Sequence, residues 1–143
     1  MKNELRVLVC GGRDYSNVEE FYEVLNWVDG SWESVDSIGP ISTIISGHAR
    51  GADQLAEKYA TERSIPLEIY PAQWDVHGKS AGVIRNQEML DEGQPDLVVA
   101  FPGGKGTAHM VKIAKKANAA VIDVADYFEW LGLSLWKTQQ VDG

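Results

Sequence analysis

The segment "ISTIISGHARGADQLAEKYATER" (residues 41–63) combines an expected strand, a glycine-rich loop and an expected helix. Its start, ISTIIS (41–46), is a short run rich in β-branched residues, which is typical of a buried strand. Its end (51–63) places Leu55 and Tyr59 at the spacing of one helical face. A strand that passes into a helix over a short loop is the repeating unit of α/β folds with parallel sheets.

The same alternation continues on both sides of this segment. Strands are predicted at 5–10, 41–46, 66–72, 95–102 and 119–124, and helices at 17–28, 51–63, 80–93 and 107–118. Strands that alternate with helices pair in parallel through right-handed crossovers. We therefore predict a Rossmann-like three-layer α/β sandwich, with a five-stranded parallel sheet of order 3-2-1-4-5 and helices on both faces.

Some segments are less regular. Ser16 is the expected N-cap of the first helix, with Glu19 completing a capping box. Residues 29–40 are expected to form a loop that can include a short turn of helix. The segment "WDVHGKS" (74–80) is also expected to form a loop, and its glycine suggests a hinge that closes over a pocket. The aromatic tail at 125–136 is expected to form a short helix.

Length and composition limit the classes of function. The 143 residues fit a single domain (1–143) with its core at 5–123. With 13 basic and 21 acidic residues, the formal charge of −8 argues against binding to duplex nucleic acid. Cys10 is the single cysteine, which excludes an intrachain disulfide. No apolar stretch approaches the roughly 20 residues that span a bilayer, so we expect a cytoplasmic protein without membrane contact.

Three glycine-containing loops follow predicted strands. "CGGRDYS" follows the first strand, "SGHARGAD" the second and "FPGGKGT" the fourth, and each carries a cation: Arg13, Arg50 or Lys105. The carboxyl ends of parallel strands share one rim of the sheet, where ligands bind. Glycines let a ligand approach the backbone, and helix N-termini attract anions. The pattern predicts an anion pocket, although the first two loops fit a tight turn or close helix packing equally well.

Arg85 lies on an apolar helical face, between Ala81 and Met89. A buried arginine needs an anion, so Arg85 either forms a structural ion pair or clamps a phosphate-bearing ligand, with Asn86 adding an amide hydrogen bond. Lys79 precedes this helix.

Several acidic and histidine side chains lie in or beside the loops. Asp14 and Asp53 either stabilise helix N-termini or bind ribose hydroxyls. His48, His77 and His109 have no short metal-binding spacing, and no metal site is predicted.

The loops do not match the common nucleotide motifs. The G-x-G-x-x-G fingerprint is absent after the first strand, and Gly106 follows Lys105 where a Walker A loop needs Ser or Thr. However, "VLVCGGRDY", "ISGHARGADQLAEKYA", "HGKSAGVIRNQEML" and "FPGGKGTAHM" together resemble the SLOG superfamily, and more narrowly its YspA/YpsA-related branch. The resemblance covers about residues 5–123 and implies a Rossmann-like fold that binds nucleotides or nucleotide-derived molecules at this rim.

The superfamily includes the LOG phosphoribohydrolases, which resemble this chain at "PGGKGT" (102–107) and at Arg85. Met110 stands where those enzymes keep a catalytic glutamate, and a thioether cannot act as an acid or base. Hydrolysis therefore remains open, with Asp14, Asp53, Arg85 and His109 as the candidate catalytic residues.

We predict a pocket for a nucleotide, or for a phosphoribosyl or ADP-ribose-like ligand. The alternatives are a nucleotide or N-glycoside hydrolase, and a phage-type sponge or anti-defence protein that sequesters a signalling nucleotide. No cofactor besides this ligand is expected. The apolar tail either closes the core or makes a homo-oligomer; its residues are Trp130, Leu131, Leu133, Leu135 and Trp136. The predicted ligand-binding residues are Gly11, Gly12, Arg13, Ser46, Gly47, Arg50, Gly51, Asp53, Lys79, Arg85, Asn86, Pro102, Gly103, Gly104, Lys105, Gly106 and Thr107.

Overall fold

The computed structural model describes residues 4–33 and 40–126 of the chain. The strands are β1 (Leu5–Cys10), β2 (Ile41–Ser46), β3 (Leu67–Ile69), β4 (Leu97–Ala100) and β5 (Ala120–Asp123). The helices are α1 (Val18–Glu33), α2 (Ala52–Glu62), α3 (Trp74–His77), α4 (Ala81–Gly93) and α5 (Lys105–Lys116), with the 3-10 turn η1 (Gly78–Ser80) between α3 and α4.

The five strands form one parallel sheet in the order β3-β2-β1-β4-β5. β1 is central, and its Val7 is aligned with Ile44 of β2 and Leu97 of β4. The chain winds outward from β1 through β2 to β3, and then continues on the other side of β1 with β4 and β5. The direction of winding thus reverses between β1 and β4, as in other doubly wound folds. The predicted Rossmann-like fold and strand order are confirmed.

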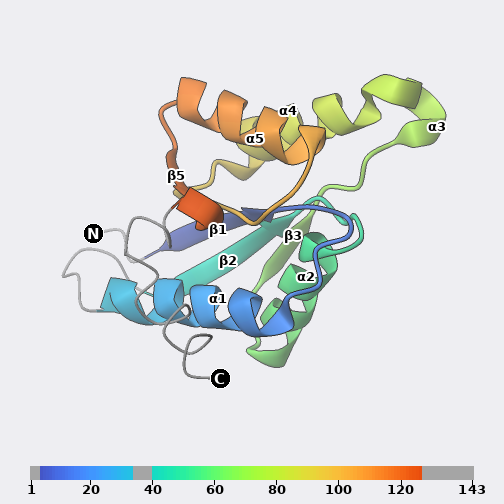
Figure 1. Ribbon diagram of the computed structural model, residues 1–143. Helices are drawn as coiled ribbons and strands as arrows, with labels where there is room; N and C mark the ends of the chain where they lie inside the picture. Colours follow the sequence, from blue (N-terminus) through green and yellow to red (C-terminus); the bar gives the residue numbers. More distant parts are fainter. Residues whose placement is uncertain (1–3, 34–39, 127–143) are drawn as a thin grey trace.

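Helices cover both faces of the sheet, with α1 and α2 on one face and α4 and α5 on the other (Figure 1). Side chains of a strand alternate between faces. Val7 and Val9 of β1 therefore join the core under α1 and α2, while Leu8 and Cys10 join the core under α4 and α5. This double burial is why the strand sequence is apolar at successive positions.

Two segments predicted as loops are at least partly helical. Residues 74–80 form α3 and η1, which project from the body of the molecule and lead directly into α4 (Figure 1). α1 continues to Glu33, into the predicted loop at 29–40. α5 begins at Lys105, inside the glycine-rich loop, rather than at residue 107.

The N-cap of α1 is Asn17 instead of the predicted Ser16. The backbone N–H of Glu20 donates to Asn17 Oδ1 over 3.1 Å, which is the hydrogen bond of an N-cap side chain. The capping prediction was therefore wrong by one residue.

Among the described helices, none has the length and apolar character needed to cross a membrane. Residues 127–136 of the aromatic tail, on which the prediction of oligomerisation rests, lie outside the described ranges.

Candidate functional site

The three glycine loops meet at Gly12. Its N–H donates to the carbonyl of Pro102 after β4 (2.9 Å), and its carbonyl accepts the N–H of Ala52 at the start of α2 (3.2 Å). Gly51 has φ +72°, and a Cβ there would overlap the Gly12 carbonyl. A Cβ on Gly103 would lie 2.6 Å from the Gly12 nitrogen. These glycines therefore let the loops pack against one another, which is the packing role that the sequence left open for the first two loops.

Gly104 and Gly106 differ from these glycines. A Cβ added to either would meet no atom within 4 Å. Gly104 is the N-cap of α5 and provides no capping side chain, so the first N–H groups of the helix face outward. Both glycines leave open the space in front of a helix N-terminus, where an anion is stabilised.

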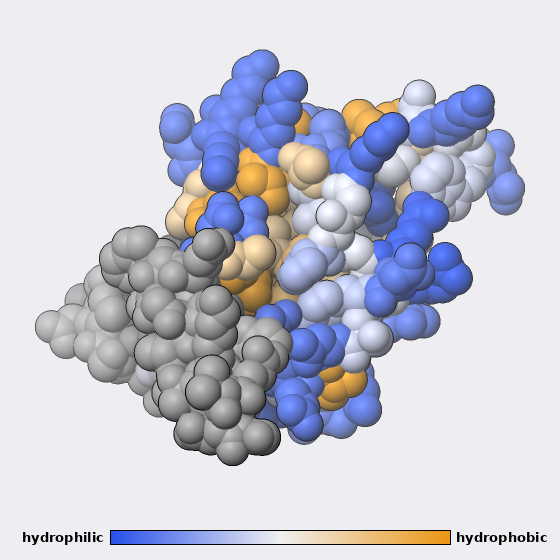
Figure 2. Space-filling model, in the orientation of Figure 1, coloured by the Kyte–Doolittle hydropathy of each residue, from blue (hydrophilic) through white to orange (hydrophobic). Residues whose placement is uncertain are grey.

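A pocket of about 920 Å³ opens between these loops and α3–α4. Figure 2 shows α3 standing away from the body of the molecule, with hydrophilic residues at its outer end and hydrophobic residues beside them. Of the predicted site residues, those that line this pocket are Gly11, Gly12, Arg13, Asp14, Asp53, Lys79, Arg85, Asn86, Pro102, Gly103, Gly104, Lys105, Gly106, Thr107 and His109.

The charge of the pocket is opposite to that of the chain. Four cationic side chains line it, and two carboxylates accompany them: Arg13, Lys79, Arg85 and Lys105 against Asp14 and Asp53. In a protein with a formal charge of −8, this local excess of cations favours an anionic ligand.

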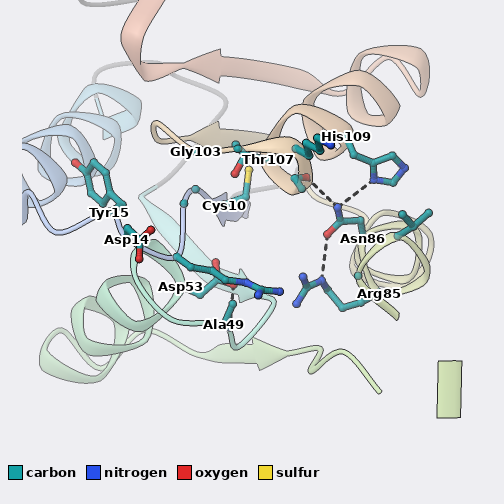
Figure 3. Close-up of a pocket in the computed structure, with 18 of the residues that line it drawn as sticks. Cys10, Asp14, Tyr15, Ala49, Asp53, Arg85, Asn86, Gly103, Thr107 and His109 are labelled. Carbon is teal, nitrogen blue, oxygen red and sulfur yellow. Dashed lines mark hydrogen bonds between the residues drawn. The ribbon is translucent and has the colours of Figure 1, made fainter. Parts of the chain in front are cut away.

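Arg85 extends from α4 toward Asp53, which lies in the first turn of α2 (Figure 3). Its Nη1 donates to the Gly47 carbonyl, and its Nε donates to Asn86 Oδ1 over 3.1 Å. Burial lowers the pKa of the guanidinium, and the nearby Asp53 partly opposes this. In the described part of the chain, Nη2 makes no hydrogen bond and remains available to a ligand. The arginine is thus held in place on one side, and it forms no direct ion pair with any residue that the structure describes.

Asn86 links Arg85 to His109. The amide is 5% exposed, and Arg85 fixes its orientation because Nε–H must face the amide oxygen. The Nδ2 group therefore donates to His109 Nδ1 (3.1 Å) and to the Gly106 carbonyl (3.2 Å). His109 Nδ1 must accept, so the imidazole carries its proton on Nε2. Figure 3 shows this row of side chains joining α4 to the start of α5.

Asp53 is a buried carboxyl of the main pocket with a raised pKa. It is 6% exposed, and burial raises its pKa to about 6. The Ala49 N–H donates to Oδ2 over 3.1 Å, and this bond and the charge of Arg85 both oppose the rise. A carboxyl that titrates near neutral pH can exchange a proton with a ligand.

Cys10 is not suited to act as a nucleophile, and Met110 is not suited to act as an acid or base. Burial raises the pKa of the Cys10 thiol, which keeps it neutral although it lines the pocket. Met110 is fully buried in the core under α4 and α5. The position at which LOG enzymes are expected to hold their glutamate is thus part of the hydrophobic core here.

Four predicted ligand residues lie outside the lining of the main pocket. Ser46 is buried, and its hydroxyl donates to Glu57 Oε2 over 3.0 Å. Gly51 packs on the Gly12 loop. Gly47 and Arg50 line a second pocket of about 440 Å³, together with His48. Among the described residues, no three His, Cys, Asp or Glu side chains are grouped so as to hold a metal ion.

Sequence reasoning missed the apolar wall of the main pocket. Trp74 is 48% exposed and stands opposite the loops, with the Arg13 guanidinium 5.5 Å from its ring centroid. Val83 of α4 and Tyr15 of the first glycine loop add further apolar surface to the lining. The tryptophan itself could have indicated this wall in the sequence. A large apolar side chain in an expected loop is exposed to water at a cost in free energy, which the binding of a ligand can offset.

Comparison with known proteins finds a matching family and a similar protein. Residues 5–77 match the family described as "YspA, cpYpsA-related SLOG family". The chain is also 34% identical over 128 residues to the "Gene 61 protein" of Mycobacterium phage D29, an alignment that covers 85% of this chain and 97% of that protein. That name does not describe an activity.

Proposed function

Because the chain belongs to the YspA, cpYpsA-related SLOG family, we propose that it binds a nucleotide or nucleotide-derived ligand in the main pocket. Membership of this family suggests nucleotide-related ligands. The observation that carries the proposal is the open start of α5 at Gly104 and Gly106, which shares one pocket with Arg85 and Arg13. Backbone N–H groups and a guanidinium group that point into the same space commonly bind phosphate together.

Size and polarity favour a nucleotide over a bare anion. The volume of about 920 Å³ is that of a site for a small organic molecule. Trp74 offers an aromatic face on which a base can stack, while the glycine loop holds the phosphate. In this arrangement Thr107 adds a hydroxyl, and the Gly11–Gly12 loop forms the wall next to the glycine loop of α5.

The test is calorimetric titration of the full chain with a panel of nucleoside monophosphates, diphosphates, cyclic nucleotides and ADP-ribose. We expect Arg85→Ala to weaken binding about 10- to 100-fold, which is the loss of a charge-assisted contact. The matched control is Lys112→Ala, which removes one positive charge from an exposed position of α5 outside the pocket. No binding above background for the whole panel contradicts the proposal.

One observation favours hydrolysis as a second candidate function. Asp53 has a pKa of about 6 and lines the main pocket, so a carboxyl that can accept or return a proton near neutral pH is present. Mass spectrometry of the ligand after incubation distinguishes the two functions. Products that disappear in Asp53→Asn indicate an enzyme, whereas an intact ligand indicates binding alone, as expected of a protein that sequesters a nucleotide.

A further inference from the structure

The second pocket adjoins the main one. Both are lined by Arg13, Ala49, Trp74 and Arg85, so they are two compartments that share a wall. We propose that the second pocket is a separate anion subsite, and that the ligand of this protein carries anionic groups at two separated positions. The inference rests on the proposed function and specifies the class of nucleotide that the site accepts.

The charges of the second pocket support an anion. Arg50 contributes from the loop between β2 and α2, and Arg13 and Arg85 contribute from the shared wall. The one carboxylate of the lining, Glu57, is already engaged: it accepts the Ser46 hydroxyl at 3.0 Å and the His48 ring at 2.9 Å. Three guanidinium groups around about 440 Å³ thus have few internal partners for their positive charge.

His48 is presented to this pocket in a specific way. Its backbone lies at φ +61°, a left-handed conformation that is uncommon for residues other than glycine, and its N–H donates to Ser46 Oγ over 3.1 Å. Nδ1 bonds to Glu57, which leaves Nε2 on the outer side of the ring. The side chain is 54% exposed, and within the described residues Nε2 has no partner. Strain that presents a polar group to a cavity is characteristic of binding sites.

Trp74 lies between the two compartments. It lines both, and the Arg13 guanidinium lies 5.5 Å from its ring centroid. A base that stacks on this ring has one cationic pocket at the start of α5 and another at Arg50. The arrangement fits a nucleotide with phosphates on two different carbons of the ribose, or at two ends of a dinucleotide. In this proposal a single 5′-linked phosphate chain occupies one compartment and leaves the other without an anion.

The test compares three probes that differ in where phosphate is attached. AMP has one phosphate, ADP has two in one chain, and adenosine 3′,5′-bisphosphate has two at separate positions. We expect the bisphosphate to bind the full chain at least about tenfold more tightly than AMP or ADP in calorimetry, which is the gain from one additional charge-assisted contact. Arg50→Ala should abolish this gain and leave the affinities for AMP and ADP unchanged.

Two further variants make the test specific. Lys58→Ala removes one positive charge from an exposed position of α2 outside both pockets, and should preserve the gain. His48→Asn keeps a residue type that tolerates the left-handed backbone but removes the imidazole, and should reduce the gain about threefold.

The outcomes are distinct. The inference is overturned if the bisphosphate binds no more tightly than ADP. It is also overturned if Arg50→Ala lowers the affinity for AMP as much as the affinity for the bisphosphate. Either result leaves the proposed function intact as long as AMP or ADP binds. If none of the three probes binds and the wider panel also fails, the proposed function itself is wrong.

Discussion

At the scale of single residues, the glycines of the rim divide into those that the fold needs and those that it does not. Gly103 lies against the Gly12 loop, and a Cβ there would come within 2.6 Å of the Gly12 nitrogen. We expect Gly103→Ala to destabilise the protein by about 1–3 kcal/mol, because the backbone must shift to accept the methyl group. Urea unfolding monitored by circular dichroism measures this loss.

The neighbouring glycine provides the control. Gly104 has φ −100°, and a Cβ added to it would meet no atom within 4 Å, so Gly104→Ala should leave the free energy of unfolding within about 0.5 kcal/mol of the wild type. A methyl group in front of the α5 N–H groups should nevertheless weaken the binding of any nucleotide that the panel identifies. Equal destabilisation by the two substitutions would contradict this division of the glycines.

Asp53 should make stability depend on pH. Its pKa is about 6 in the folded protein and 3.8 for an unperturbed side chain, so the folded state binds more protons between these pH values. Stability therefore falls as pH rises from about 4 to 6, by up to about 3 kcal/mol. Asp53→Asn retains an oxygen for the Ala49 N–H and cannot ionise. In thermal unfolding at several pH values, the stability of Asp53→Asn relative to the wild type should therefore increase as pH rises from about 4 to 6.

At the scale of elements, the sequence located all five strands, but β3 (Leu67–Ile69) and β4 (Leu97–Ala100) are shorter than the predicted 66–72 and 95–102, and the irregular helices were predicted poorly. β1 and β2 were located to the residue because each is a short apolar run that ends at glycine. α3 was missed because four residues are too few to show helical periodicity. The early start of α5 was missed because glycines indicated a loop, although the first turn of a helix tolerates them where N–H groups are unpaired anyway.

The candidate site, too, could be predicted only in part from the sequence. The meeting of three loops could be predicted, because the carboxyl ends of parallel strands share one rim. The division into two pockets could not, since it depends on the direction that each loop takes after its strand. Arg50 and Arg85 were therefore placed in one site, whereas Arg50 lines only the second pocket. Trp74 was missed because its position follows from α3.

The N-cap of α1 gives a prediction at this scale. Asn17 accepts the Glu20 N–H through its side chain, so Asn17→Ala should lower the free energy of unfolding by about 1 kcal/mol. Ser16→Ala is the matched substitution one residue earlier and should change stability by less than half as much. Chemical denaturation of both variants decides which residue caps the helix. A larger loss of unfolding free energy for Ser16→Ala would show that Ser16 is the N-cap.

At the scale of the whole molecule, the main pocket and a stabilising cluster around Arg6 lie at opposite ends of β1. The pocket lies at the carboxyl end of β1, where Cys10 forms part of its lining. Near the amino end of the same strand, Arg6 reaches across β2 and donates to both carboxylate oxygens of Glu68 on β3, each over 2.8 Å. It also donates to the carbonyl of Gly93 at the end of α4 over 2.7–2.9 Å. One side chain thus joins three elements at the end of the sheet opposite the pocket.

Arg6→Ala should therefore lower stability without changing the affinity for nucleotide. Removing the half-buried guanidinium leaves the Gly93 carbonyl and the Glu68 carboxylate without this partner, at an expected cost of about 1–3 kcal/mol. The dissociation constant of the nucleotide that binds best should stay within about twofold of the wild type, because the site is built at the other end of β1. Arg6→Lys keeps the charge but not the fork, and should restore only part of the stability. A loss of affinity in Arg6→Ala at a temperature where the variant remains folded would show that the two ends of the sheet are coupled.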